Sequence, residues 1–187
     1  MVPAGNLGNT SAFGKALTEM EALGLIDEKP RIASIQAEGA NPFYRLWKGG
    51  GSLEPVKPET LATAIKIGNP VSWRKALRAI EATDGVVEQV SDQEILDAKA
   101  VVDMSGIGCE PASAASVAGA KKLAEAGIIS PDEDVVCILT GNLLKDPEAS
   151  VLYHTGSMAG VEPRFPNPPV TIDADVASVE EALRVSR

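Results

Sequence analysis

The chain has 187 residues, of which 44% are apolar, and its formal net charge is −9 at pH 7. This length and apolar content suffice for one folded domain with a hydrophobic core. An acidic chain without clustered lysine and arginine does not attract a polyanion, so we expect no nucleic-acid partner. The N-terminus has no charged and apolar leader, and the apolar runs are short. These features predict a cytoplasmic protein without a membrane partner.

The first predicted elements are a helix and a buried strand. Apolar residues recur every three or four positions between Phe13 and Leu23, which predicts a helix that stops near Gly24 and begins at a Gly/Asn turn over residues 5–9. The short apolar run 32–37 predicts a strand. Residues 41–58 contain proline and three consecutive glycines, which predict an irregular loop with one helical turn.

Two helices and a corner are predicted next. Helical spacing of apolar residues covers 60–67 and 73–82. Between them lies Gly68-Asn69-Pro70, where proline prevents one helix from continuing through. We therefore expect two helices that meet at this turn.

The second half of the chain alternates strands and helices. Residues 86–90 are rich in valine and predict a strand, and Ser91 with Glu94 forms the pattern of a capping box at the start of the next helix. The Ala-rich segment 111–126 predicts a further helix, and 134–139 predicts a β-branched buried strand. Each of these strands follows or precedes a helix, as in a parallel sheet.

This alternation predicts an α/β fold, mainly a parallel sheet with helices on both faces. Residues 153–169 are rich in Gly, Pro and Asn and predict a loop, and 176–185 predict a short terminal helix. Ligands of such sheets bind beyond the carboxyl ends of the strands. Residues 5–9 and Thr140 both fall at such ends.

The Gly5–Asn9 turn has the composition of an anion site. Two glycines three positions apart allow a tight turn and a close approach to a ligand, and the following helix presents unpaired N–H groups at its positive end. A plain helix cap has the same pattern. On physical grounds alone, both interpretations stay open.

The segment Pro3–Ala12, Pro-Ala-Gly-Asn-Leu-Gly-Asn-Thr-Ser-Ala, resembles the phosphate loop of threonine synthases, which are fold-type-II enzymes dependent on pyridoxal phosphate (PLP). Further blocks resemble this family in the same order: Gln36–Pro42, Ala64–Trp73, Glu110–Ala115, Leu139–Gly141 and Leu144–Pro147. The resemblance extends from Val2 to about Pro169. It identifies the chain as the C-terminal portion of the large PLP domain, over residues 1–187, with the N-terminal portion and the small domain absent.

The resemblance implies a cofactor site with two parts. The backbone amides of Gly5, Asn6, Leu7, Gly8 and Asn9 would hold the PLP phosphate, and the Thr140 hydroxyl would contact the pyridine nitrogen. The implied reaction of the complete enzyme, a lyase of threonine biosynthesis, converts O-phospho-L-homoserine and water to L-threonine and phosphate. PLP supplies the electron sink for this chemistry.

Two departures from the family pattern concern catalysis and the second half of the site. The family binds PLP covalently through a lysine in an upstream Ser-Phe-Lys-Asp-type motif, and no lysine of this sequence matches it. We therefore expect no catalytic residue in this chain and no activity from it alone. Asn142-Leu143 also stands where the family commonly has His-Gly, which removes a glycine able to adopt positive φ.

The remaining reactive side chains favour structural roles. His154 is the only histidine and lies in a predicted loop, so neither a metal site nor a Ser-His-Asp triad is expected. Cys109 and Cys137 lie among small or apolar residues, which favours buried free thiols over a disulfide. The aromatic residues between Phe43 and Trp47 are expected to pack locally.

Two functions from different classes remain open. The first is a threonine synthase fragment whose missing N-terminal half is supplied in cis or in trans, with a homodimer as one assembly of the complete enzyme. The second is a noncatalytic phosphate- or PLP-binding module, or one half of a split enzyme. An incomplete sheet exposes apolar surface and unpaired edges, so we expect the isolated chain to self-associate.

Overall fold

The computed structural model describes residues 1–185. In chain order its strands and helices are β1 (Val2–Pro3), α1 (Gly8–Ala22), β2 (Ala33–Ala37), α2 (Pro42–Gly49), α3 (Trp73–Ala82), β3 (Val86–Val90), α4 (Asp92–Met104), α5 (Pro111–Glu125), α6 (Pro147–His154) and α7 (Val176–Val185). The strands pair in parallel in the order β1-β2-β3. The expected α/β fold with a parallel sheet is confirmed.

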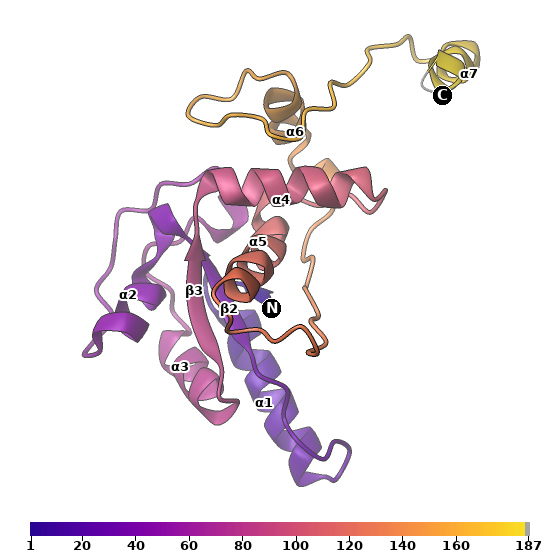
Figure 1. Cartoon of the computed structure of the whole chain (residues 1–187). Coiled ribbons are helices and arrows are strands. Elements are labelled where there is room, and N and C mark those ends of the chain that lie inside the picture. The colour runs from indigo at the N-terminus through magenta and orange to yellow at the C-terminus, as the bar shows by residue number, and fades with distance from the viewer. Residues whose placement is uncertain (186–187) are drawn as a thin grey trace.

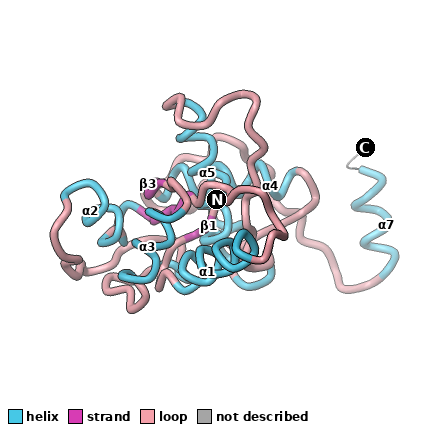
Figure 2. Tube along the Cα trace, turned by 90° about the horizontal axis from the view of Figure 1, so that it is seen from below, coloured by secondary structure: helices cyan, strands magenta, loops and turns pink. Residues whose placement is uncertain are grey.

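Helices cover both faces of this sheet, as expected (Figures 1 and 2). Ile35 and Ala37 of β2 pack with α4 and α5 in one core. Val2 of β1 and Val87 of β3 pack with α1, α2 and α3 in a second core on the other face. The alternation of side chains along a strand therefore supplies both cores.

Helices with strong local signals are found where the sequence predicts them. Helix α3 covers the predicted segment 73–82. At the start of α4 the Glu94 backbone N–H donates to Ser91 Oγ (3.2 Å), and the Ser91 backbone N–H donates to Glu94 Oε2 (2.6 Å). This reciprocal capping box is the predicted one and satisfies two backbone donors.

Two predictions of local structure are wrong because long-range contacts decide the backbone. The predicted loop 41–58 contains α2, whose first amides, those of Phe43 and Tyr44, donate to the buried Gln36 Oε1 at 2.9 Å. The predicted helix 60–67 is only a 3-10 turn at Thr63–Ile65, because the Asp92 carboxylate binds the preceding residues. The predicted loop 153–169 is found from Thr155 onward, and only its first two residues belong to α6, so His154 ends a helix.

The predicted strand 134–139 is also wrong, although this segment lies beside β1. The Met1 amino group donates to Val136 O (2.8 Å), and Ile138 N–H donates to Met1 O (3.1 Å), which is the pattern of one parallel pair. Pro3 has no N–H and cannot donate the next bond to Ile138 O. That carbonyl accepts from Ser116 Oγ instead (3.2 Å), so the ladder ends after one pair.

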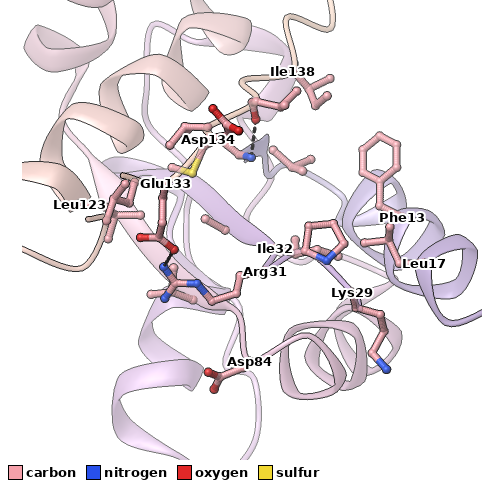
Figure 3. A pocket seen from close by; sticks show the side chains of 18 of the residues that line it. Phe13, Leu17, Lys29, Arg31, Ile32, Asp84, Leu123, Glu133, Asp134 and Ile138 are labelled. Atoms are coloured by element: carbon pink, nitrogen blue, oxygen red, sulfur yellow. Dashed lines mark hydrogen bonds and ion pairs between the residues drawn. The ribbon is translucent and has the colours of Figure 1, made fainter. Parts of the chain in front are cut away.

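An apolar cavity of about 660 Å³ lies at the amino ends of the strands (Figure 3). Phe13 and Leu17 of α1 point into it, and Arg31 and Glu133 form an ion pair at 2.5 Å on its wall. The apolar stripe of α1 therefore faces this cavity, and its Phe13 and Met20 side chains are each 37% exposed. The opposite end of the sheet carries the candidate site.

The C-terminal region leaves this body. Helix α6 packs against α4 through Tyr153, whose hydroxyl donates to Asp97 Oδ1 at 2.7 Å. Helix α7 lies apart at the end of an extended segment (Figure 1). No helix within residues 1–185 is long and apolar enough to cross a membrane.

Candidate functional site

The Gly5–Asn9 loop begins at the carboxyl end of β1. Ala4 N–H completes the pairing of β1 by donating to Ile35 O (2.8 Å). The buried Gln36 side chain donates to Ala4 O (3.4 Å) while its oxygen accepts from the first amides of α2. One fully buried amide therefore fixes the start of the loop to a second helix.

Leu7 gives the loop its shape. It caps α1 with φ 65° and ψ 13°, a left-handed conformation that costs a residue with a side chain roughly 1–2 kcal/mol. Its side chain is 2% exposed and packs in the α1–α3 core, a burial that stabilises by roughly 1.5–3 kcal/mol and offsets this strain. A left-handed residue followed by helical Gly8 turns three successive N–H groups, of Leu7, Gly8 and Asn9, toward one concave side.

These amides are free to bind a ligand. Within residues 1–185 the backbone N–H groups of Gly5, Asn6, Leu7, Gly8 and Asn9 donate to no protein acceptor, and the first intrahelical bond of α1 is Ser11 N–H to Leu7 O (3.1 Å). Gly8 and Asn9 are exposed. Unpaired amides at the positive end of a helix favour an anion such as a phosphate.

The Ala64–Trp73 block of the family resemblance packs directly against this loop. Asn6 Oδ1 accepts from Val71 N–H (2.8 Å), and Asn6 O accepts from Ser72 N–H (3.4 Å). A Cβ added at Gly5 would lie 3.0 Å from Ile65 Cα, so this position has no room for a side chain. The side-chain oxygen of Asn6 thus holds the loop in place, and its Nδ2 donates to no protein acceptor within residues 1–185.

Thr140 reaches the same edge of the sheet. Because Cys137 lies beside Met1 in parallel, Thr140 and the Gly5–Asn9 loop both follow the carboxyl ends of adjacent extended segments. Thr140 is exposed, and its Oγ1 lies 3.1 Å from Ser113 Oγ. Thr140 and the Gly5–Asn9 loop therefore lie at the same edge of the sheet.

Ser113 is a residue of this region that the sequence did not single out. It lies in the first turn of α5, is 0% exposed, and its Oγ accepts from Gly141 N–H at 2.8 Å. The preceding Glu110 donates its backbone N–H to Gly141 O (3.0 Å). The small residues around Ser113 predicted only a packed helix. The sequence did not reveal its contact with Gly141, because the two residues are 28 positions apart and no local pattern marks such a contact.

The Asn142-Leu143 departure leaves the loop regular. Asn142 has φ −76°, and its Oδ1 accepts from Leu144 N–H at 2.9 Å, so it caps the 3-10 turn Leu143–Lys145. Among described residues with side chains, only Leu7 and Asp84 have positive φ. This chain therefore does not need the glycine that the family commonly has at this position.

Two lysines of this region form ion pairs. Lys145 Nζ lies 3.0 Å from Glu110 Oε2, and the buried Lys99 Nζ lies 2.5 Å from Asp103 Oδ2.

Burial raises the pKa of the neighbouring Cys109 thiol to about 11, so this thiol is not a nucleophile at neutral pH. Both cysteines are free, with Cys109 buried and Cys137 partly buried.

His154 has a structural partner. Its Nδ1 accepts from Asn167 N–H at 3.0 Å, and burial lowers its pKa. Within the described part of the chain, no group of His, Cys, Asp and Glu side chains could hold a metal ion.

Comparison with known proteins decides the family. Residues 1–141 match the family model described as pyridoxal-phosphate dependent enzyme. The chain belongs to this family. It is 44% identical over 186 residues to a threonine synthase of Methanosarcina acetivorans and 45% identical over 187 residues to one of Methanocaldococcus jannaschii. Each alignment covers 98% of this chain and 43% of the relative.

The fold comparison agrees. The crystal structure of threonine synthase from Escherichia coli superposes with a TM-score of 0.62 at 17% identity, covering 99% of this chain and 43% of that one. The PLP-dependent fold expected from the sequence is therefore confirmed. The chain spans less than half of the length of the relatives it matches.

Proposed function

We propose that the Gly5–Asn9 loop and Thr140 form the cofactor site of a threonine synthase, of which residues 1–187 are the C-terminal portion of the large domain. The observation that supports this most directly is the set of unpaired amides at Leu7, Gly8 and Asn9. Their concave arrangement at a helix N-terminus suits a phosphate.

The chain's own residues would do three things. The loop amides would neutralise the PLP phosphate and anchor one end of the cofactor. The exposed Thr140 hydroxyl, at the same sheet edge, would donate to the ring nitrogen and orient the other end. Gln36 and Asn6 would hold the loop against α2 and the 71–72 segment, so that little rearrangement accompanies binding.

PLP bound in this way would withdraw electrons from the substrate's reacting carbons. The substrate proposed is O-phospho-L-homoserine, and the products are L-threonine and phosphate. The covalent lysine and the rest of the active site would come from the upstream half in cis or in trans. The apolar cavity at the amino ends of the strands favours a missing upstream half over a self-sufficient binding module, because an uncovered apolar surface is unfavourable in water.

Complementation tests this function. The chain is co-expressed with the portion of the Methanosarcina acetivorans relative that it does not cover, and phosphate release from O-phospho-L-homoserine is measured. We expect release with the wild-type chain and a strong loss with Thr140→Val. If a soluble chain bound PLP but co-expression produced no phosphate release, the noncatalytic module would be favoured.

A further inference from the structure

The hydroxyl of Ser113 lies between three groups of the Thr140-Gly141 segment. Ser113 Oγ is 2.8 Å from Gly141 N, 3.1 Å from Thr140 Oγ1 and 3.3 Å from Gly141 O. Ser113 is fully buried, so water does not replace these partners. The proton of the Ser113 hydroxyl must therefore be given to one of these partners.

The assignment follows from counting donors and then comparing distances. Gly141 N–H can only donate, so Ser113 Oγ accepts from it and has a single proton left to give. That proton goes to Thr140 Oγ1 or to Gly141 O. Gly141 O already accepts from Glu110 N–H at 3.0 Å and is the more distant of the two. Gly141 O has a second lone pair, so the count alone leaves both acceptors open, and the shorter contact assigns the Ser113 proton to Thr140 Oγ1.

This direction decides what Thr140 can do. Once its oxygen accepts from Ser113, the Thr140 proton points away from the buried network toward the exposed side of the residue. Thr140 then acts as a donor and suits a ring nitrogen that has a lone pair. The positive end of α5, where Ser113 lies, disfavours a protonated ring nitrogen in the same place.

We propose that Ser113 is a positioning residue that makes the Thr140 hydroxyl a hydrogen-bond donor toward the PLP ring nitrogen. This inference rests on the proposed function of Thr140. Without the Ser113 hydroxyl, the Thr140 proton is no longer directed outward, and the Gly141 amide loses its acceptor.

The helix offers a matched control. Ser116 is also fully buried on α5, and its Oγ contacts Ser113 O (2.8 Å) and Ile138 O (3.2 Å) but not Thr140. Ser113→Ala and Ser116→Ala each delete one buried hydroxyl from the same helix. A merely structural effect would appear in both variants.

The test uses the chain with PLP labelled with ¹⁵N in the ring. For the wild type and Ser116→Ala we expect a ring-nitrogen resonance typical of an unprotonated, hydrogen-bonded acceptor. In Ser113→Ala it should move toward the position of Thr140→Val, and PLP should bind about 2- to 10-fold more weakly. The ring-nitrogen resonance of the double variant Ser113→Ala/Thr140→Val should match that of Thr140→Val, because Ser113 acts on the ring nitrogen only through the Thr140 hydroxyl.

A wild-type resonance in Ser113→Ala would overturn the role of Ser113 while leaving the proposed function intact. If PLP bound through its phosphate but Thr140→Val left the ring-nitrogen resonance unchanged, both the Thr140 contact and this inference would be overturned. Amide exchange of Gly141 in the chain without PLP gives a second readout. It should accelerate in Ser113→Ala only, and unchanged exchange there would also contradict the inference.

Discussion

Replacement of Asn9 by proline removes one amide from the phosphate loop without disturbing its scaffold. Asn9 is the second residue of α1, and its N–H has no acceptor within residues 1–185. Proline is tolerated in the first turn of a helix because that N–H is unpaired in any case. The free energy of unfolding should therefore change by less than about 0.5 kcal/mol, as for other exposed positions.

The loss appears in phosphate binding. A hydrogen bond to a charged acceptor contributes roughly 1.5–3 kcal/mol, so PLP should bind about 10- to 140-fold more weakly to Asn9→Pro. Asn9→Ala is the control, because it deletes the side chain and keeps the amide. Fluorescence titration with PLP compares the three chains. Equal affinities of the wild type and Asn9→Pro, or an equal loss in Asn9→Ala, would refute the assignment to the backbone.

Three further predictions concern the scaffold. Gly14→Ala places a Cβ 2.2 Å from Ala79 Cβ and should destabilise the α1–α3 contact by roughly 1–3 kcal/mol in urea unfolding, whereas Gly49→Ala, where a Cβ meets open space, should not. The Cys109 pKa near 11 exceeds the ordinary value of 9.0, so the unfolded thiol ionises first and the free energy of unfolding should fall from pH 9 to 11, a slope that Cys109→Ser reduces. The isolated chain should self-associate in sedimentation velocity because of its apolar cavity and open edge, and a clean monomer with cooperative unfolding would contradict this.

Local signals in the sequence predicted the elements that local interactions decide. The capping box at Ser91 and Glu94 and the apolar spacing of α3 act within one or two helical turns, and both elements are found as predicted. The shared sheet edge of the Gly5–Asn9 loop and Thr140 was also predictable, because parallel strands place their carboxyl ends together. Their roles in cofactor binding stay predictions.

Contacts between distant segments explain what the sequence did not reveal. The 134–139 segment has strand composition, but its ladder ends because its neighbour is Pro3. Leu7 is not a residue type expected at positive φ, and the burial of its side chain in the α1–α3 core offsets the strain of this conformation. The partner of Gln36 that begins α2 lies several residues away in a different element.

The central claim is that the Gly5–Asn9 loop binds the phosphate of PLP. It is tested most directly by following backbone amides in ¹H–¹⁵N spectra while PLP or pyridoxal, which lacks the phosphate, is added to the chain. We predict that the amides of Leu7, Gly8 and Asn9 shift saturably with PLP and not with pyridoxal. Equal shifts with pyridoxal, or PLP-dependent shifts confined to other parts of the chain, would contradict it.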